Sequence, residues 1–347
     1  MKRKYVLAVV LCLAVVATLT ACGAAKFGSV SFVDPQHGWV TGFGPATART
    51  VVSRTLDGGE TWQVVGSRVG RSVMGGWVGW TLFSTTSTGV WCVEVNKLLF
   101  TTNGGDQWKV ASVSGMKRGY FSAASFATDS IGWAAGVRGT DNVALTEAGA
   151  GGSIAKTTDG GATWRVQKTI KGPDRSGGFL DVACPSESTC YALKRGARGG
   201  VWATSDGGAT WARHELPGKS AQPVYEAIDF PTELVGWAVG SVGKIAKTTD
   251  GGVTWVAQVS GVPGRLHGLC FTSVDRGFVV GKSGVILSTQ DGGSTWVRQA
   301  SGTTSTLNAV DFVSDGEGWV VGEAGWAPEQ AGTLLHTTDG GQTWKLR

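Results

Sequence analysis

The sequence predicts an all-β protein, a seven-bladed β-propeller. An octapeptide of the form Thr-x-Asp-Gly-Gly-x-Thr-Trp occurs seven times, beginning at Thr55, Thr101, Thr157, Thr204, Thr248, Thr289 and Thr337. The Asp or Asn of successive copies lie 41 to 56 residues apart, and 40 to 50 residues is the usual length of a propeller blade. The 55 Gly and 16 Trp are typical of many short strands joined by tight turns.

A second element precedes each octapeptide and completes the pattern of one blade. In five copies a Phe is followed seven residues later by another aromatic residue: Phe32 and Trp39, Phe126 and Trp133, Phe230 and Trp237, Phe271 and Phe278, Phe312 and Trp319. Phe83 and Val90 take these places in the second copy, and Cys184 and Tyr191 in the fourth. Strand A is expected to end near the Phe, and strand B to carry Gly-Trp-x-x-Gly. Strand C then leads into the octapeptide, and strand D begins at its Trp.

This pattern predicts the limits of the blades. They are expected at residues 29–66, 78–113, 120–169, 178–216, 224–260, 265–300 and 306–347. The ring is expected to close between whole blades, without a terminal strand borrowed from the other end of the chain. The longest insertion, from Gly136 to Ile154, is predicted to form a loop between strands B and C of the third blade.

The N-terminus predicts export and membrane attachment. Basic residues 2–4 precede an uncharged, mostly apolar stretch, residues 5–19, which is too short for a membrane-spanning helix of about 20 residues. It ends in Leu19-Thr20-Ala21-Cys22, which resembles a bacterial lipoprotein processing box with acylation of the Cys22 thiol. We therefore expect a signal peptide at 1–21, a lipid-anchored Cys and tether at 22–28, and the propeller at 29–347, on the periplasmic side or the cell surface. An uncleaved anchor is the alternative.

Composition and spacing favour no nucleic-acid, metal or cofactor site. The formal charge of +5 becomes +2 when the three basic residues of the signal peptide are removed, so the chain has no basic excess for nucleic acid. The four His, at 37, 214, 267 and 336, have no metal-ligand spacing. Phosphate loops, nucleophile elbows and redox CxxC motifs are absent from the sequence. We expect a monomer without cofactors.

Four cysteines remain after Cys12 leaves with the signal peptide and Cys22 takes the lipid. Cys184 and Cys190 flank the turn-like spacer Pro-Ser-Glu-Ser-Thr, and export permits a disulfide, so this pair is predicted to be bonded across the A–B turn of the fourth blade. Cys92 and Cys270 lie in apolar contexts and are predicted to be buried thiols.

The octapeptide resembles the Asp-box, or bacterial neuraminidase, repeat. Among Asp-box proteins, the chain resembles the photosystem II assembly/stability factor family, because Phe230 to Gly240 with the box at Thr248, and Phe312 to Gly322 with the box at Thr337, follow that family's blade pattern. The resemblance implies a non-catalytic scaffold that binds a membrane-protein client and helps it assemble, in photosynthesis where the organism has a photosystem. It also implies that the box residues stabilise turns: Asp57, Asn103, Asp159, Asp206, Asp250, Asp291 and Asp339.

The alternative is a glycan-binding or glycoside-hydrolysing propeller similar to sialidases. Sialidases are six-bladed and need an arginine triad and a Tyr nucleophile with a Glu partner, and no Arg-Ile-Pro occurs near the N-terminus. Tyr120, Tyr191 and Tyr225 are the tyrosines after the signal peptide, and only Tyr225 has an adjacent Glu, Glu226. A glycosidase needs two carboxylates roughly 5 to 9.5 Å apart. The candidates on inner strands are Asp181, Glu226, Asp229 and Asp311, which we interpret as polar residues that face the channel.

Charge is expected to separate between the two faces of the ring. Loops D–A and B–C share one face, and A–B turns and boxes share the other. The first face is assigned sixteen basic residues, Arg49, Arg68, Arg71, Lys97, Lys117, Arg118, Arg138, Lys171, Arg175, Lys194, Arg195, Arg198, Lys219, Lys244, Arg265 and Lys282, against seven acidic ones. The second face is assigned fifteen acidic residues and a single basic one, Arg276. We expect the first face to bind an acidic segment of a membrane protein or anionic lipid headgroups, through Arg118, Arg175, Arg195, Arg198 and Arg265.

Overall fold

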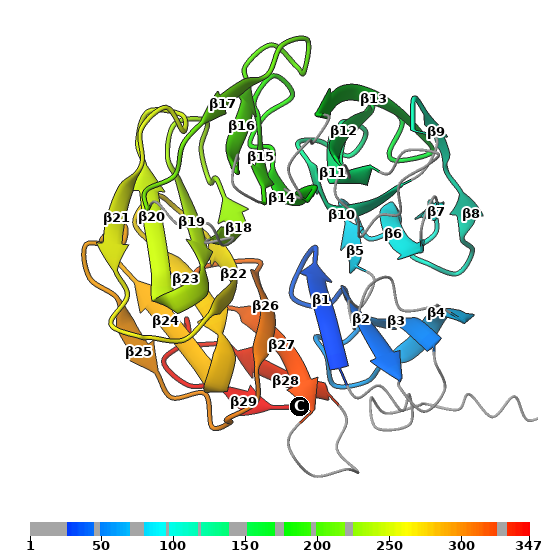
Figure 1. Cartoon of the computed structure of the whole chain (residues 1–347). Coiled ribbons are helices and arrows are strands. Elements are labelled where there is room, and N and C mark those ends of the chain that lie inside the picture. The colour runs from blue at the N-terminus through cyan, green and yellow to red at the C-terminus, as the bar shows by residue number, and fades with distance from the viewer. Residues whose placement is uncertain are drawn as a thin grey trace, which may run out of the picture.

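The computed structural model describes residues 26–44, 49–69, 80–94, 97–116, 119–138, 151–170, 177–195, 199–218, 225–324 and 332–347. The described chain forms short antiparallel sheets arranged in a ring around a central channel (Figure 1). The predicted seven-bladed propeller is confirmed. In this part of the chain, no helix has the length and apolar character needed to cross a membrane.

Each blade has four strands in the order A to D. Blade one has β1 (Lys26–Phe32), β2 (Gly38–Gly44), β3 (Arg49–Thr55) and β4 (Gln63–Val69). Blade two has β5 (Trp80–Phe83), β6 (Gly89–Glu94), β7 (Lys97–Thr101) and β8 (Lys109–Val110), followed by β9 (Ser112–Ser114). Blade three has β10 (Gly119–Phe126), β11 (Gly132–Arg138), β12 (Gly151–Thr157) and β13 (Thr163–Ile170). Blade four has β14 (Phe179–Ala183), β15 (Cys190–Lys194), β16 (Gly200–Thr204) and β17 (Ala212–His214).

The remaining three blades repeat this order. Blade five has β18 (Tyr225–Asp229), β19 (Gly236–Gly240), the 3₁₀ turn η2 (Ser241–Gly243), β20 (Lys244–Thr248) and β21 (Val256–Val259). Blade six has β22 (Leu266–Phe271), β23 (Gly277–Gly281), η3 (Lys282–Gly284), β24 (Val285–Thr289) and β25 (Val297–Gln299). Blade seven has β26 (Leu307–Phe312), β27 (Gly318–Ala324), β28 (Gly332–Thr337) and β29 (Lys345–Leu346).

Three details differ from the sequence expectation. Strand β1 begins at Lys26, so residues 26–28 belong to the first blade and not to the tether. Strands β11 and β12 extend to Arg138 and back to Gly151, because their ladder continues past the expected loop limits of Gly136 and Ile154. Strand β9 pairs in parallel with β13, so a segment expected in blade two lies on the outer edge of blade three.

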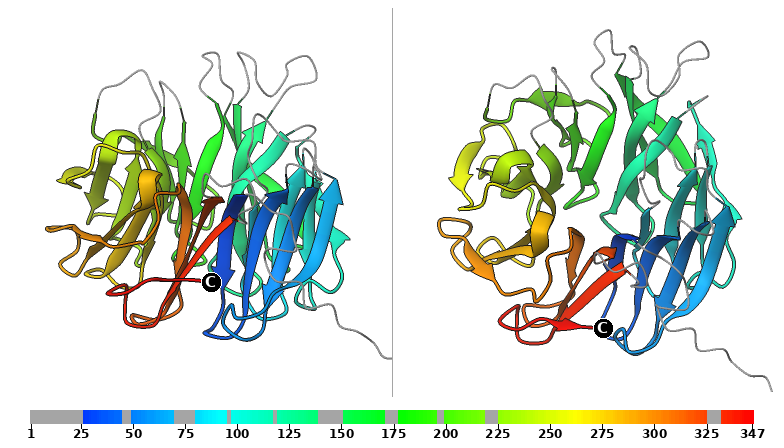
Figure 2. Two further views of the ribbon diagram at one scale, coloured as in Figure 1. Left: turned by 90° about the horizontal axis from the view of Figure 1, so that it is seen from below. Right: turned by 60° about the horizontal axis from the view of Figure 1, so that its bottom comes forward.

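The ring closes where blade seven meets blade one, and each of these blades keeps its own four strands. Strand β1 lies against β26 and β27, and Lys26 pairs with Glu323 across the seam (Figures 1 and 2). The Lys26 Nζ and the Glu323 Oε1 are 2.7 Å apart. The predicted closure between whole blades is therefore confirmed.

The core lies between the blades and is built from the two repeated aromatic positions. The strand-A Phe of one blade stacks on the strand-B aromatic of the preceding blade at five seams: Phe32 on Trp319, Phe83 on Trp39, Phe230 on Tyr191, Phe271 on Trp237 and Phe312 on Phe278, with ring centroids 3.5 to 3.9 Å apart. The box Trp of the same blade packs edge-on against that Phe, as Trp255 does on Phe230 at 5.8 Å. Each repeat thus contributes half of an aromatic stack, which is completed only by its neighbour.

Candidate functional site

The Asp-boxes are closed turns in which the repeated side chains bond to one another. In the first box the Thr55 hydroxyl donates to Asp57 Oδ1 at 2.7 Å and accepts the Gly59 N–H at 2.8 Å. Asp57 Oδ1 also accepts the Thr61 N–H at 2.9 Å, and Oδ2 accepts the Thr61 hydroxyl. Gly58 and Gly59 adopt positive φ values of 73° and 99°, which explains why two glycines follow the Asp.

The same bonds keep the box carboxylates ionised. Hydrogen bonds from the Thr hydroxyl and N–H four residues later lower the pKa of Asp250, Asp291 and Asp339 to about 2. A carboxylate whose two oxygens are both occupied within its own turn is poorly placed to serve as a catalytic base. Their geometry is that of a turn-stabilising residue.

The boxes also join adjacent blades. The carbonyl oxygen of the first box Gly accepts a side-chain donor from the preceding blade: Gly104 from Trp39 and Arg54, Gly207 from Lys156 and Gln167, Gly292 from Gln258, Gly340 from Arg276 and Gly58 from Trp319. Because Arg54 and Lys156 also donate to box carbonyls, Arg276 is not the single cation on the box face, contrary to the sequence expectation. The residue before the last one of strand C points to the next box, so Arg54 and Lys156 reach this face as well.

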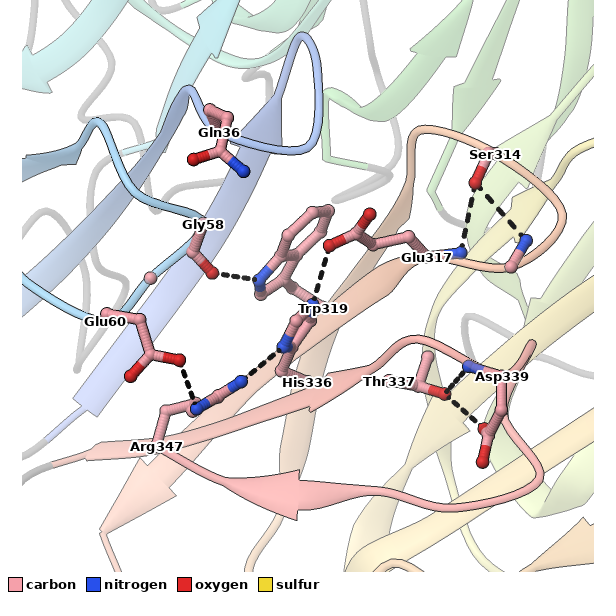
Figure 3. A network of polar contacts seen from close by, with 12 residues as sticks. Gln36, Gly58, Glu60, Ser314, Glu317, Trp319, His336, Thr337, Asp339 and Arg347 are labelled. Atoms are coloured by element: carbon pink, nitrogen blue, oxygen red, sulfur yellow. Dashed lines mark hydrogen bonds and ion pairs between the residues drawn. The ribbon is translucent and has the colours of Figure 1, made fainter.

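A polar network covers the box side of the closing seam (Figure 3). His336 Nε2 lies 3.1 Å from Glu317 Oε1, and its Nδ1 lies 3.0 Å from Arg347 Nη2. Because Arg347 can only donate, Nδ1 accepts, and the proton of the neutral ring is on Nε2. Arg347 also pairs with Glu60 of the first box, so one Arg connects blades seven and one. Burial lowers the pKa of His336, which is consistent with the neutral ring.

Cysteines replace the aromatic stack at one seam. Cys184 and Cys190 form a disulfide and pack against Trp133 and the box Trp211, where the other blades have the strand-A Phe. Cys92 is buried, and its thiol donates to the Phe121 carbonyl at 3.1 Å. Cys270 is half-buried beside the channel, and burial raises the pKa of both free thiols.

The inner-strand carboxyls bind backbone N–H groups of the next blade. Asp229 Oδ2 accepts the Phe271 N–H at 2.7 Å and its Oδ1 accepts the Phe230 N–H at 2.8 Å. Asp311 likewise accepts the Phe32 N–H across the closing seam at 2.7 Å, and Asp181 accepts the Ile228 N–H at 2.9 Å. Strand A is the inner edge of each sheet, so these N–H groups have no partner within their own sheet.

The same three carboxyls line a channel cavity of about 500 Å³ together with Cys270, Ser125 and apolar strand-A side chains. Burial raises the pKa of Asp181 and Asp311 to about 6 and that of Asp229 to about 7. Each carboxyl already accepts two N–H groups, and this use explains its position in the repeat. In the described part of the chain no three His, Cys, Asp or Glu side chains gather in a way that could hold a metal ion.

The tyrosines do not form a nucleophile pair. The Tyr225 hydroxyl donates to the Pro217 carbonyl at 3.1 Å, and burial raises the pKa of Tyr225 to about 12. Burial also raises the pKa of Tyr191 to about 12, and the Tyr191 hydroxyl donates to the Glu233 carbonyl. Glu226 contacts Arg265 and His267 instead of Tyr225. An activated nucleophile needs a lowered pKa or an adjacent base.

The predicted basic-face residues are placed in part. Arg195 follows strand β15 and Arg265 precedes β22, so both lie at the face that carries the D–A and B–C connections. Arg118, Arg175 and Arg198 lie outside the described residues, as does the predicted lipidation site Cys22. Nine of the sixteen assigned cations are described at this face, at the ends of strands: Arg49, Arg68, Lys97, Arg138, Lys194, Arg195, Lys244, Arg265 and Lys282.

Residues 261–346 match the family model of the photosynthesis system II assembly factor YCF48. The resemblance predicted from the sequence is confirmed. A solved structure of YCF48 bound to a D1 peptide is similar with a TM-score of 0.65 at 20% identity, over 91% of this chain and 94% of that chain. YCF48 from Cyanidioschyzon merolae gives a TM-score of 0.64 at 18% identity, over 90% and 96% of the two chains.

Both structural likenesses concern the fold, an Asp-box propeller of the YCF48 type. A GH74 xyloglucanase from Xanthomonas campestris is also similar, with a TM-score of 0.45 at 15% identity, over 92% of this chain and 53% of that chain. No curated protein matches the sequence.

The sequence did not reveal contacts that depend on neighbouring blades. The group of Glu226, Arg265 and His267, and the network of His336, Arg347 and Glu60, combine residues from different repeats. The repeat alignment offered one usable signal, because His267 and Glu226 occupy the same position of strand A in consecutive blades, four residues before the Phe.

Proposed function

We propose that this chain is a non-catalytic, lipid-anchored propeller that holds an acidic segment of a membrane-protein client on its D–A/B–C face, called the basic face below. Binding there would assist assembly of the client's complex. The observation that carries the proposal is the separation of charge between the two ends of the ring.

The described residues support this separation. Four acidic residues are described at the basic face beside these nine cations: Glu94, Glu215, Glu226 and Glu323. The last three form ion pairs, Glu215 with Arg213, Glu226 with Arg265 and Glu323 with Lys26. The opposite face has fifteen described acidic residues, of which six are the box Asp residues. The cations that reach this face are fewer, and they include Arg54, Lys156, Arg276 and Arg347. A face with excess positive charge raises the association rate and the affinity for acidic partners.

The comparisons supply a precedent for the partner class. The solved YCF48 structure holds a D1 peptide on a propeller of the same fold. A peptide client is therefore physically compatible with this architecture. The family model that matches residues 261–346 describes an assembly factor, and this match supports an assembly role.

The position of the first strand supports the membrane orientation. Strand β1 begins on the basic face at Lys26, four residues after Cys22. An extended chain spans at most about 3.5 Å per residue, so a lipid on Cys22 would hold this face within about 14 Å of the bilayer surface. An anchored propeller would then present its cations to the membrane and to membrane-protein segments.

The use of the inner carboxyls supports a non-catalytic role. Asp181, Asp229 and Asp311 bond to N–H groups of the next blade, and the box Asp residues bond within their turns. Hydrolysis of a sialoside or a β-glucan that disappears in Asp229→Asn or Asp311→Asn would contradict this part of the proposal.

Charge reversal on the basic face tests the proposal. We expect Arg118→Glu, Arg175→Glu, Arg195→Glu and Arg198→Glu together to weaken binding of an acidic peptide at least tenfold, with a salt dependence that nearly disappears. The matched control reverses four exposed cations on outer strands D: Lys109, Arg165, Arg298 and Lys345. Equal effects of the two sets, or an unchanged affinity in the first, would contradict the proposal.

A further inference from the structure

Strand A of six blades carries a β-bulge at the same position. The ladder with strand B shifts by one residue near the start of β1, β10, β14, β18, β22 and β26. The extra residues are Gly28, Ser122, Leu180, Glu226, His267 and Asn308. Strand A begins at the basic face and lines the channel, so these residues surround the channel at its basic-face end. Bulges re-aim side chains and are frequent beside binding sites.

Two consecutive bulges hold a carboxylate between two nitrogen donors. Glu226 Oε1 lies 3.1 Å from Arg265 Nε, and Glu226 Oε2 lies 3.1 Å from His267 Nδ1. The Glu226 side chain is 16% exposed and that of His267 is 23%, whereas the Arg265 side chain is 56% exposed. The carboxylate is thus largely covered, while the guanidinium that binds it stays open to solvent.

A backbone bond fixes the position of Arg265, and the next bulged residue along the ring also bonds across a seam. The Lys282 N–H donates to the Arg265 carbonyl at 2.9 Å, which ties the residue to the B–C turn of its own blade. In the next blade the bulged Asn308 donates to the Phe27 carbonyl at 2.7 Å. Of the two donors that face Glu226, His267 lies within the inner strand β22 and Arg265 directly precedes it.

We propose that Arg265 and His267 form a receptor for an acidic side chain of the client peptide, and that Glu226 occupies this receptor in the unbound protein. An Arg guanidinium and an imidazole N–H are suited to a carboxylate, and the structure already shows them holding one. An incoming carboxylate displaces that of Glu226 and releases it towards the channel. This inference rests on the proposed function and names the site at which a client is recognised.

Occupancy of the receptor by Glu226 sets the apparent affinity of the protein for an acidic peptide. A ligand binds only the fraction of molecules whose receptor is open, so its apparent dissociation constant is the intrinsic one divided by that fraction. Glu226 acts here as a built-in competitor, which lowers the apparent affinity of every carboxylate ligand of this receptor by the same factor. The simpler explanation is a structural tie between blades five and six. The two explanations predict different effects of removing the Glu226 charge: tighter peptide binding for the receptor, and an unchanged affinity with a lower melting temperature for the tie.

The test is the affinity of Glu226→Gln for a blocked hexaglutamate peptide, acetylated at its N-terminus and amidated at its C-terminus. We expect binding about three- to tenfold tighter than in the wild type, because one partly covered ion pair no longer competes. Glu215→Gln is the matched control, since it removes one negative charge from the same face, where Glu215 pairs with Arg213 at 3.4 Å. It is expected to leave the affinity within about twofold of the wild type.

A double-mutant cycle shows whether the gain depends on the receptor. Arg265→Gln should weaken hexaglutamate binding, and Arg265→Gln with Glu226→Gln should bind no better than Arg265→Gln alone. Melting temperatures of all variants separate this effect from destabilisation. A purely structural tie would lower the melting temperature of Glu226→Gln and leave its affinity for the peptide unchanged.

Other results of the binding experiments would contradict either the receptor or the proposed function. An equal gain in Glu226→Gln and Glu215→Gln, or the same gain with a blocked hexaglutamine peptide, would overturn the inference. The inference would also be overturned if Glu226→Gln bound more tightly only to a neutral peptide with a free C-terminal carboxylate, or only to anionic phosphatidylglycerol vesicles. If the wild-type protein does not bind hexaglutamate, or if reversal at Arg118, Arg175, Arg195 and Arg198 leaves binding unchanged, then the proposed function itself fails. Wild-type binding without a specific gain in Glu226→Gln refutes only the receptor.

Discussion

At the scale of the residue, the second Asp-box shows what each box side chain contributes. Asn103 replaces the Asp and Gln107 replaces the second Thr. Asn103 Oδ1 still accepts the Thr101 hydroxyl at 2.9 Å and the Gln107 N–H at 3.0 Å. In the third box the other carboxylate oxygen, Asp159 Oδ2, also accepts the Thr163 hydroxyl, at 2.6 Å. The second box lacks this bond, because an amide nitrogen cannot accept it.

Repair of this box should stabilise the protein. Asn103→Asp with Gln107→Thr is expected to raise the free energy of unfolding by about 1 kcal/mol, since it adds one hydrogen bond to a charged acceptor at an exposed turn. Chemical denaturation of the double variant and of both single variants measures the effect. Asn103→Asp alone supplies the acceptor without the hydroxyl, so it should give less than half of the gain. A double variant no more stable than the wild type would contradict the assigned role of the second carboxylate oxygen.

At the scale of the element, the Phe that ends strand A and the Gly that begins strand B depend on each other. A Cβ on Gly236 would lie 2.4 Å from the Phe230 ring, and equivalent glycines in five other blades would meet their own Phe at 2.3 to 2.8 Å. Blade four has Cys184 and Cys190 at these two positions and bonds them. A side chain is tolerated at 190 because no ring lies above it.

This dependence predicts the outcome of converting blade four to the common pattern. Cys184→Phe with Cys190→Gly should fold and should melt at the same temperature with and without reductant, because the introduced ring can stack on Trp133. Cys184→Phe alone should be strongly destabilised, since the Cys190 Cβ occupies the space of the ring. In the wild type, reduction of the disulfide should cost about 2 kcal/mol for so short a loop.

Mass spectrometry of the unreduced wild type provides the accompanying check of the crosslink. Two free thiols at positions 184 and 190 would refute it. A reductant-sensitive melting temperature in the converted double variant would show that the effect of reductant lies elsewhere.

At the scale of the whole molecule, the ring contains buried ionisable groups with opposite effects on stability. The folded-state pKa values of Asp181, Asp229 and Asp311 are raised, so their contribution to stability is fully present below about pH 4 and is lost as the pH rises through 6 to 7. The pKa of His336 is lowered by burial, so its contribution is present above its usual pKa of 6.5 and is lost as the pH falls. Protonation of His336 would also remove the acceptor for Arg347 and place a positive charge beside it.

Asp229 should dominate the pH dependence near neutrality. With a folded pKa of about 7, it is expected to make the wild type about 1.4 kcal/mol more stable at pH 6 than at pH 8. Asp229→Asn should lose this difference, although it lowers stability throughout because an amide accepts one N–H instead of two. Denaturant unfolding at both pH values gives the comparison. The control is Asp129→Asn, an exposed side chain on the same cavity, which should keep the wild-type difference.

Much of the fold could be predicted from the sequence because each blade repeats local signals. The box predicts a turn through its own Thr, Asp and Gly, and all of its internal bonds join residues at most four positions apart. Seven boxes at blade-length spacing then predict the number of blades. Blade limits were less accurate at the first strand and at the third B–C connection, where strand pairing continues into residues with no repeat signal.

The sequence by itself therefore determined the architecture and the chemistry of the turns, because these depend on short-range spacing. For the same reason it predicted the pairing of Cys184 with Cys190. Only the tertiary structure decided which polar side chains meet between blades. Asp229 reaches Phe271, Glu226 reaches His267 and Arg347 reaches Glu60, and each contact joins residues 41 to 287 positions apart. These contacts arise because ring closure sets the inner edge of each sheet against its neighbour, where unpaired N–H groups and buried charges must find partners in the adjacent blade.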